Sequence, residues 1–122
     1  MALARNIMKG GWSAGNAKAV NGAVATGLVA TGTVRTDALA LQADTAVMGT
    51  VASGTGVILS QFLSPGEEQS VFNAGANALK VYPPTGFQIN ALATNAPMLL
   101  ATNTGCLFKC ISTTRVFGIL SA

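Results

Sequence analysis

The side chains that could do chemistry in this 122-residue chain are two cysteines and four carboxylates, because the sequence contains no histidine. It therefore lacks the commonest general base and the commonest transition-metal ligand. Cys106 and Cys110 fall in a segment that reads as one strand. At ~3.3 Å per residue their Cα atoms would lie ~13 Å apart, too far for a disulfide. Their even spacing puts both thiols on the face of Phe108, so we expect free cysteines packed in the core.

The four carboxylates do not form a recognisable catalytic or metal-binding set. Glu67 and Glu68 are adjacent, so in an extended chain they point to opposite faces and cannot flank one bond. Asp37 and Asp44 match no calcium-binding loop, and a zinc site would need four suitable ligands. We therefore expect no catalytic residues, no metal and no cofactor, and we predict that the protein is not an enzyme.

The elements that would position these side chains are short strands separated by turns. Pro65 and Gly66 fit the centre of a type II turn, because proline presets the first φ and glycine accepts the positive second one. Segments 71–73 and 79–82 carry β-branched and aromatic residues, and residues 74–77 between them suit a four-residue loop. We expect an antiparallel hairpin over these segments.

Apolar residues that alternate with period two predict strands along the rest of the chain. Pro83 and Pro84 remove two backbone donors, so the strand before them should end there or run along an edge. The expected strands are 39–42, 47–51, 57–59, 71–73, 79–82, 98–101, 106–111 and 115–120. The predicted fold class is all-β: a jelly-roll-like β-sandwich of about eight antiparallel strands, residues 37–122, with an extended N-terminal arm.

The predicted arm, residues 1–36, is rich in glycine and alanine and is basic. It carries four basic residues and no acid (+4), whereas the rest of the chain has a net charge of −1. A basic arm can meet nucleic-acid phosphates or an acidic protein surface, and the sparse charges without interleaved aromatics favour the protein surface over specific nucleic-acid binding. A solvated arm with Trp12 folded back on its own domain is the alternative. The predicted partner-binding residues are Arg5, Lys9, Trp12 and Lys18.

The last two predicted strands form a hairpin through residues 112–114. Leu107, Lys109 and Ile111 would share the face opposite the cysteines. Two apolar residues that flank a lysine fit the rim of an interface, unless the second sheet covers them. These three residues are the predicted interface face.

The composition indicates contact with partners. Half of the residues are hydrophobic and only 9% are charged, against ~25% in an ordinary soluble domain. A small protein with so few charged residues is expected to cover much of its surface with partner proteins. The alternative is a soluble monomer whose surface is rich in alanine. The first residues lack the apolar core of a secretory signal, and prolines interrupt the long uncharged stretch 81–108. We therefore expect no membrane segment and a reducing compartment for the free thiols.

The segments Asn73 to Gly75, Leu79 to Gly86 and Ile89-Asn90, followed by the strands 106–111 and 115–120, resemble small structural proteins of tailed bacteriophages. Among these, the chain resembles the capsid cement, or decoration, proteins. The likeness covers roughly the C-terminal two-thirds of the chain, and it departs from the expected pattern at Phe117, where a tryptophan would stand.

The resemblance implies a viral structural protein that binds the assembled head and stabilises contacts between major capsid subunits. It would lie on the capsid surface of the virion after synthesis in the host bacterial cytoplasm. Its partners would be the major capsid protein and further copies of itself, as a dimer or trimer. Two alternatives stay open: a tail or fibre module that recognises a host-surface glycan, and a coat or tail subunit that assembles by itself.

Overall fold

A computed structural model describes residues 23–121 of the chain; residues 1–22 and 122 lie outside the described part. The described residues form ten β-strands and one short 3-10 turn. In chain order these are β1 (Val24–Val29), η1 (Arg35–Asp37), β2 (Leu39–Ala40), β3 (Thr45–Thr50), β4 (Gly56–Ile58), β5 (Glu68–Asn73), β6 (Leu79–Tyr82), β7 (Gln88–Ile89), β8 (Met98–Leu100), β9 (Thr104–Cys110) and β10 (Arg115–Leu120).

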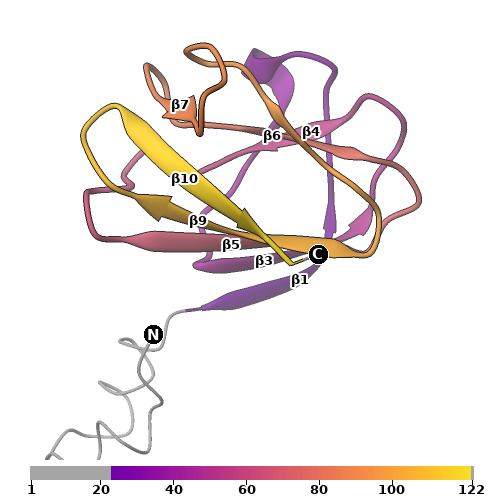
Figure 1. Cartoon of the computed structure of the whole chain (residues 1–122). Coiled ribbons are helices and arrows are strands. Elements are labelled where there is room, and N and C mark those ends of the chain that lie inside the picture. The colour runs from indigo at the N-terminus through magenta and orange to yellow at the C-terminus, as the bar shows by residue number, and fades with distance from the viewer. Residues whose placement is uncertain (1–22, 122) are drawn as a thin grey trace, which may run out of the picture.

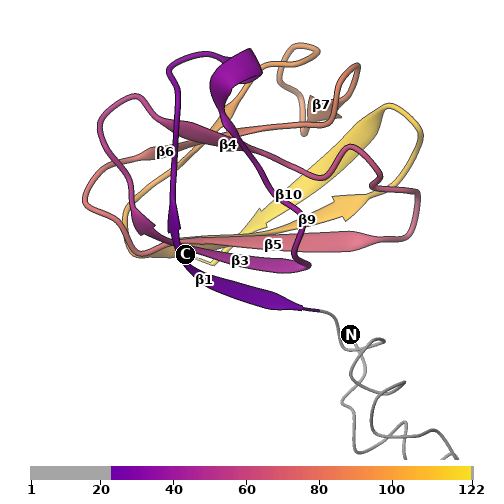
Figure 2. The ribbon, with the colours of Figure 1, turned by 180° about the vertical axis from the view of Figure 1, so that it is seen from behind.

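The strands form two facing sheets (Figure 1). One sheet has six strands in the order β1-β3-β5-β9-β10-β7, and the other has four in the order β2-β4-β6-β8. From β1 to β8 each strand lies in the opposite sheet from the strand before it. The chain therefore winds as a flattened coil, and the view from behind shows the same two layers (Figure 2).

The coil runs in one direction and then reverses. The strands β1, β3 and β5 are parallel in one sheet, and β2, β4 and β6 are parallel in the other. Parallel neighbours need a crossover connection, and here each crossover contains a strand of the opposite sheet. The chain then returns, so β8 pairs antiparallel with β6 and β9 pairs antiparallel with β5.

The all-β prediction with two packed sheets is confirmed, but the antiparallel jelly-roll arrangement is not what the described residues form. Five of the eight strand pairings are parallel, and the strands number ten instead of about eight. The alternation of apolar residues marks a strand with one buried face, but it carries no information about the direction of the neighbouring strand.

The predicted hairpin between 71–73 and 79–82 is wrong, because β5 and β6 belong to different sheets. The residues between them form a corner that passes from one sheet to the other. The Asn73 side chain closes this corner by accepting a hydrogen bond from the Gly75 N–H (2.9 Å) and donating one to the Asn77 carbonyl (2.9 Å). Gly75 packs so closely on Val51 that any side chain would overlap it.

Three other local predictions are confirmed. Gly66 has a φ of +92°, and the Glu67 N–H donates to the Ser64 carbonyl (2.9 Å), as a type II turn at Pro65-Gly66 requires. The strand β6 ends at Tyr82, directly before the two prolines. The strands β9 and β10 form an antiparallel hairpin.

The boundary between arm and body differs from the expected one. The sequence assigns residues 23–36 to the arm, yet β1 pairs with β3 along its length and η1 contacts β4. Arg35 donates to the Pro83 carbonyl (2.9 Å) and to the Thr85 hydroxyl (3.0 Å), which ties this segment to the connection that follows β6. The body therefore begins no later than residue 24.

The core lies between the two sheets. Alternate residues of the central strands β3, β5 and β9 point inward, and the four-stranded sheet meets them with β4, β6 and β8. The fully buried apolar side chains are mostly aliphatic, with one aromatic ring among them. They include Met48, Val57, Leu59, Val71, Leu79, Val81, Ile89, Leu100, Phe108 and Val116.

Two buried side-chain amides form hydrogen bonds with backbone groups in the segments that pass from one sheet to the other. Gln69 is 2% exposed; its side-chain oxygen accepts from the Ser60 N–H (2.8 Å) and its nitrogen donates to the Ala43 carbonyl (3.0 Å). Asn73, also 2% exposed, donates to the Leu100 carbonyl (2.9 Å) in addition to its bonds within the corner. Unpaired backbone groups in such places would be costly, so these amides hold neighbouring corners together.

Replacing Gln69 with alanine is expected to lower the free energy of unfolding by about 2 kcal/mol or more, because it leaves the Ser60 N–H and the Ala43 carbonyl without a partner. Urea unfolding measures the loss. Gln42→Ala is the matched control: Gln42 is exposed and should change stability by no more than about 0.5 kcal/mol. Equal effects of the two substitutions would contradict this role.

Candidate functional site

The candidate site is the outward face of the six-stranded sheet, which carries an unusual number of apolar side chains. We define the apolar face by five residues: Val47, Phe72, Leu107, Phe117 and Ile119. The strand registers bring them together: Val47 lies opposite Phe72, and Leu107 lies opposite Ile119. Three of them are well exposed, with Phe72 at 43%, Phe117 at 41% and Ile119 at 61%.

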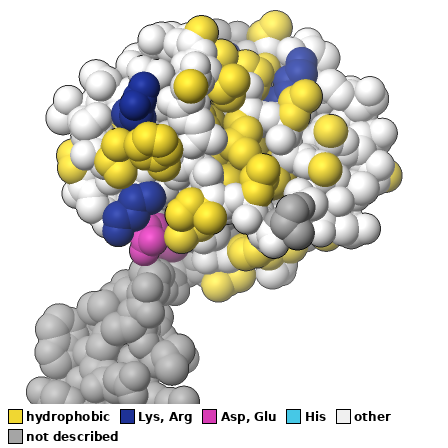
Figure 3. All heavy atoms as spheres, viewed as in Figure 1, with side chains coloured by type: hydrophobic (Ala, Val, Ile, Leu, Met, Phe, Trp, Pro, Cys, Tyr) yellow, Lys and Arg dark blue, Asp and Glu magenta, His cyan; other side chains and the backbone are white. Residues whose placement is uncertain are grey.

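The charged residues on this face lie next to one another or to an aromatic ring. Glu68 and Lys109 are directly opposite on β5 and β9, and Lys109 is opposite Phe117 on β10. The Arg115 guanidinium lies 5.5 Å from the centroid of the Phe117 ring, within the range of a cation–π contact. Hydrophobic side chains gather over β9 and β10 with basic side chains beside them (Figure 3). The face is therefore apolar in its centre, with one acidic and two basic side chains beside the apolar residues.

The position of Phe72 depends on a glycine in the neighbouring strand. Phe72 is opposite Gly105 across β5 and β9, and its ring covers the backbone there. Any side chain at position 105 would overlap the ring. An aromatic ring laid over a cross-strand glycine fixes both the register and the shape of the surface.

The predicted interface residues lie partly on this face. Leu107 and Lys109 are half-buried on the outward side of β9, as expected. Ile111 is 48% exposed but follows the end of β9, in the connection to β10. Their role as an interface stays a prediction. Phe72, Phe117 and Ile119, the larger apolar side chains of β5 and β10, were not predicted as interface residues. The alternation of Arg115, Phe117 and Ile119 along one strand could have indicated that they share a face.

The predicted partner-binding residues of the arm, Arg5, Lys9, Trp12 and Lys18, lie outside the described residues. Their role stays a prediction. The charges of the described part cancel, with four basic and four acidic residues. Of the net charge of +3, all comes from residues 1–22, so the electrostatic contrast between this segment and the body remains.

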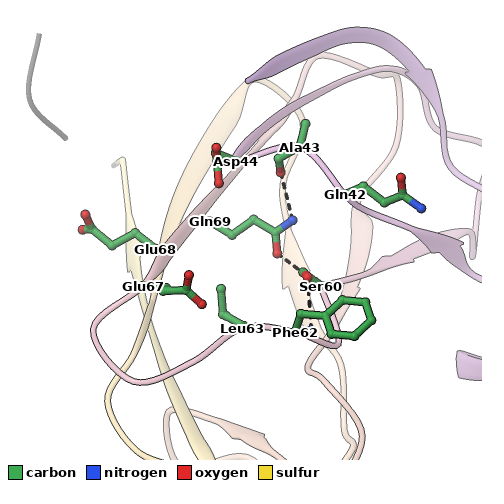
Figure 4. Close-up of a pocket in the computed structure, with 9 residues that line it drawn as sticks. All are labelled: Gln42, Ala43, Asp44, Ser60, Phe62, Leu63, Glu67, Glu68 and Gln69. Carbon is green, nitrogen blue, oxygen red and sulfur yellow. Dashed lines mark hydrogen bonds between the residues drawn. The ribbon is translucent and has the colours of Figure 1, made fainter. Parts of the chain in front are cut away.

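A pocket apart from the apolar face is lined by three carboxylates, and two of them accept hydrogen bonds from backbone N–H groups (Figure 4). This pocket of about 130 Å³ lies beside Gln69. Glu67 accepts a hydrogen bond from the Ser64 N–H (2.7 Å), Asp44 accepts one from the Ala23 N–H (3.0 Å), and Glu68 points away from Gln69. Carboxylates that accept hydrogen bonds from backbone N–H groups in this way stabilise the loops around them.

Residues 23–121 offer neither a metal-binding cluster nor a membrane-spanning helix. No group of three or more histidine, cysteine or acidic side chains in this part is placed to hold a metal ion. No helix there is long and apolar enough to cross a membrane.

The two cysteines are packed in the core, as expected. Cys106 and Cys110 are free and buried on the inward face of β9 beside Phe108. Burial raises the pKa of the Cys106 thiol to about 11, although a backbone hydrogen bond partly opposes this, and burial also raises the pKa of Cys110. A thiol with a raised pKa is a poor nucleophile, so both cysteines act as small apolar side chains.

Comparison of the chain with protein-family models, curated proteins and solved structures gave no match.

The raised pKa of Cys106 predicts a loss of stability at alkaline pH. An unfolded chain loses this proton near pH 9.0, whereas the folded chain keeps it until about pH 11. The unfolded state therefore binds fewer protons between these values, and the free energy of unfolding falls as the pH rises through that window. The stability advantage of the native chain over a Cys106→Ala variant should shrink from pH 9 to pH 11 in urea unfolding. A constant difference would contradict the assignment.

Proposed function

We propose that this protein is a viral structural protein of the capsid cement, or decoration, class, which binds assembled heads and stabilises contacts between major capsid subunits. The observation that carries the proposal is the apolar face: a broad sheet surface with three well-exposed large apolar side chains and few charges. Surfaces of this kind mark protein–protein contacts. The resemblance of segments 73–90 and 106–120 to phage structural proteins supplies the class of partner.

The mechanism is stabilisation by binding, without catalysis. A protein that binds the assembled lattice and not the free subunits stabilises the lattice by its own binding free energy, repeated over many copies. The apolar face supplies the desolvated centre of the contact, and Lys109 and Arg115 supply a polar margin. The basic segment 1–22 would add contacts to an acidic part of the coat, with further copies of the chain beside it as a dimer or trimer.

Two other functions would give different results in simple experiments. A tail or fibre module that recognises a host glycan would label tails and give reproducible hits on a glycan array. A coat or tail subunit would polymerise into shells or tubes when purified alone. Labelling of heads by a chain that does not polymerise supports the cement role and excludes both alternatives.

Replacing Phe117 with serine is expected to weaken binding to capsids that lack the protein by at least ~10-fold, because it removes a central aromatic ring from the apolar face. Co-sedimentation with purified capsids measures the change. Phe62→Ser is the matched control, because Phe62 is 89% exposed and lines the separate pocket beside Gln69. Unchanged binding by the Phe117 variant would remove the apolar face from the mechanism.

Trp12 offers an independent test, because it is the single tryptophan of the chain. If residues 1–22 contact the coat, the Trp12 ring should leave water on binding. The fluorescence emission of the protein should then shift to shorter wavelength when capsids are added, and Trp12→Ala should weaken co-sedimentation. An emission maximum that stays constant while the protein sediments with capsids would show that Trp12 takes no part.

A further inference from the structure

The strand β10 has an open edge along its second half. It pairs with β9 along one side, but on the other side β7 pairs with it only at Arg115 and Val116 (Figure 1). Because β7 ends the sheet, no other strand of residues 23–121 lies beside Gly118, Ile119 and Leu120. Exposed edges are usually protected by charges or prolines, and these three residues supply neither.

Leu120 turns its backbone N–H and C=O groups toward this open edge. In an antiparallel pair, successive residues of a strand bond alternately to its two sides. The Ser121 N–H donates to the Gly105 carbonyl (2.8 Å), so Ser121 bonds toward β9 and Leu120 faces away from it. Gly118 also faces away, and its N–H already donates to the Asn90 side chain (2.9 Å). The groups that the edge can offer to a further strand are therefore centred on Leu120.

The side chains around this edge are apolar and exposed. Leu120 itself is 51% exposed. An open hollow of about 560 Å³ is lined by residues of the loop after β7 and of the edge strand β8, among them Leu92 and the 64% exposed Leu99. The hollow adjoins β10, because Asn90 both lines it and bonds to that strand. The open edge and the hollow therefore form one apolar surface at this end of the two sheets.

The charge pattern of this surface suits a second copy of the chain. In a two-fold dimer each residue near the axis meets its own copy, so a charged residue there would meet a like charge. The segments 81–108 and 116–122 contain no charged residue, and they include the whole hollow and the open edge. Antiparallel pairing of the edge with its own copy would also give each free backbone group a partner of the opposite kind.

We propose that two copies of the chain form a dimer in which their β10 strands pair antiparallel at Leu120. The N–H and C=O groups of Leu120 bond to Leu120 of the second copy, and the two-fold axis runs perpendicular to the sheet. The two six-stranded sheets become one continuous sheet, whose outward side carries the apolar faces of both copies. The dimer needs only this chain, so it does not depend on the proposed capsid role.

Sedimentation equilibrium of the full chain without capsids tests the dimer. At about 100 μM the native chain is expected to have twice the chain mass of 12.2 kDa. Leu120→Lys places two like charges at the axis and should raise the dissociation constant at least ~10-fold. Val29→Lys is the matched control, because Val29 is also 51% exposed but lies on β1, at the opposite edge of the sheet. A native chain that is monomeric or trimeric, or equal effects of the two substitutions, would overturn the proposal.

Disulfide cross-linking gives a second test that does not require the lysine variant to fold. Directly opposite residues that exchange backbone hydrogen bonds have Cα atoms ~5.5 Å apart, a distance that a disulfide can span. Cys106 lies opposite Leu120 on β9, so Cys106→Ala is included to prevent a disulfide within one chain. In that background, Leu120→Cys is expected to form a linked dimer at least ~10-fold faster than Val29→Cys under mild oxidation, because the dimer holds the two thiols together. Equal rates would overturn the proposed pairing.

Discussion

The structure depends on satisfying the backbone each time the chain passes from one sheet to the other. At such a corner, a backbone N–H or C=O group that is buried without a partner would lower stability by more than a typical hydrogen bond adds to it. Gln69 and Asn73, both on β5, supply such partners by bonding to the distant Ala43 and Leu100 carbonyls. The coil is thus held by polar bonds at its corners as well as by apolar packing between its sheets.

This arrangement explains why the outward face of the six-stranded sheet is free to carry apolar residues. The inward residues of β5 and β9 build the core, so the alternate positions face away from it. Yet they hold Phe72 and Leu107, and β10 adds Phe117 and Ile119. Keeping such side chains exposed favours association, so they are most simply explained by a partner that covers them.

The sequence was informative about local structure and uninformative about connectivity. The turn at Pro65-Gly66 and the end of a strand before Pro83-Pro84 were predicted correctly, because both follow from backbone chemistry. The burial of Cys106 and Cys110 was predicted correctly, because it follows from the period of two in a strand. The segment 74–77 was misread as a hairpin loop, because a tight hairpin and a corner between sheets use the same small and polar residues. The corner is distinguished by contacts with distant residues, such as the hydrogen bond from Asn73 to the Leu100 carbonyl. Of the five residues of the apolar face, only Leu107 was predicted at an interface. The other four lie on strands whose neighbours in the sheet could not be foreseen.

The central claim is that the apolar face is buried against a capsid. The most direct measurement is an electron cryomicroscopy reconstruction of capsids incubated with the full chain. The account predicts density for the two-sheet body on the head, with Phe72, Phe117 and Ile119 in contact with coat subunits. A body bound with this face turned to solvent, or capsids that carry no added density, would contradict it.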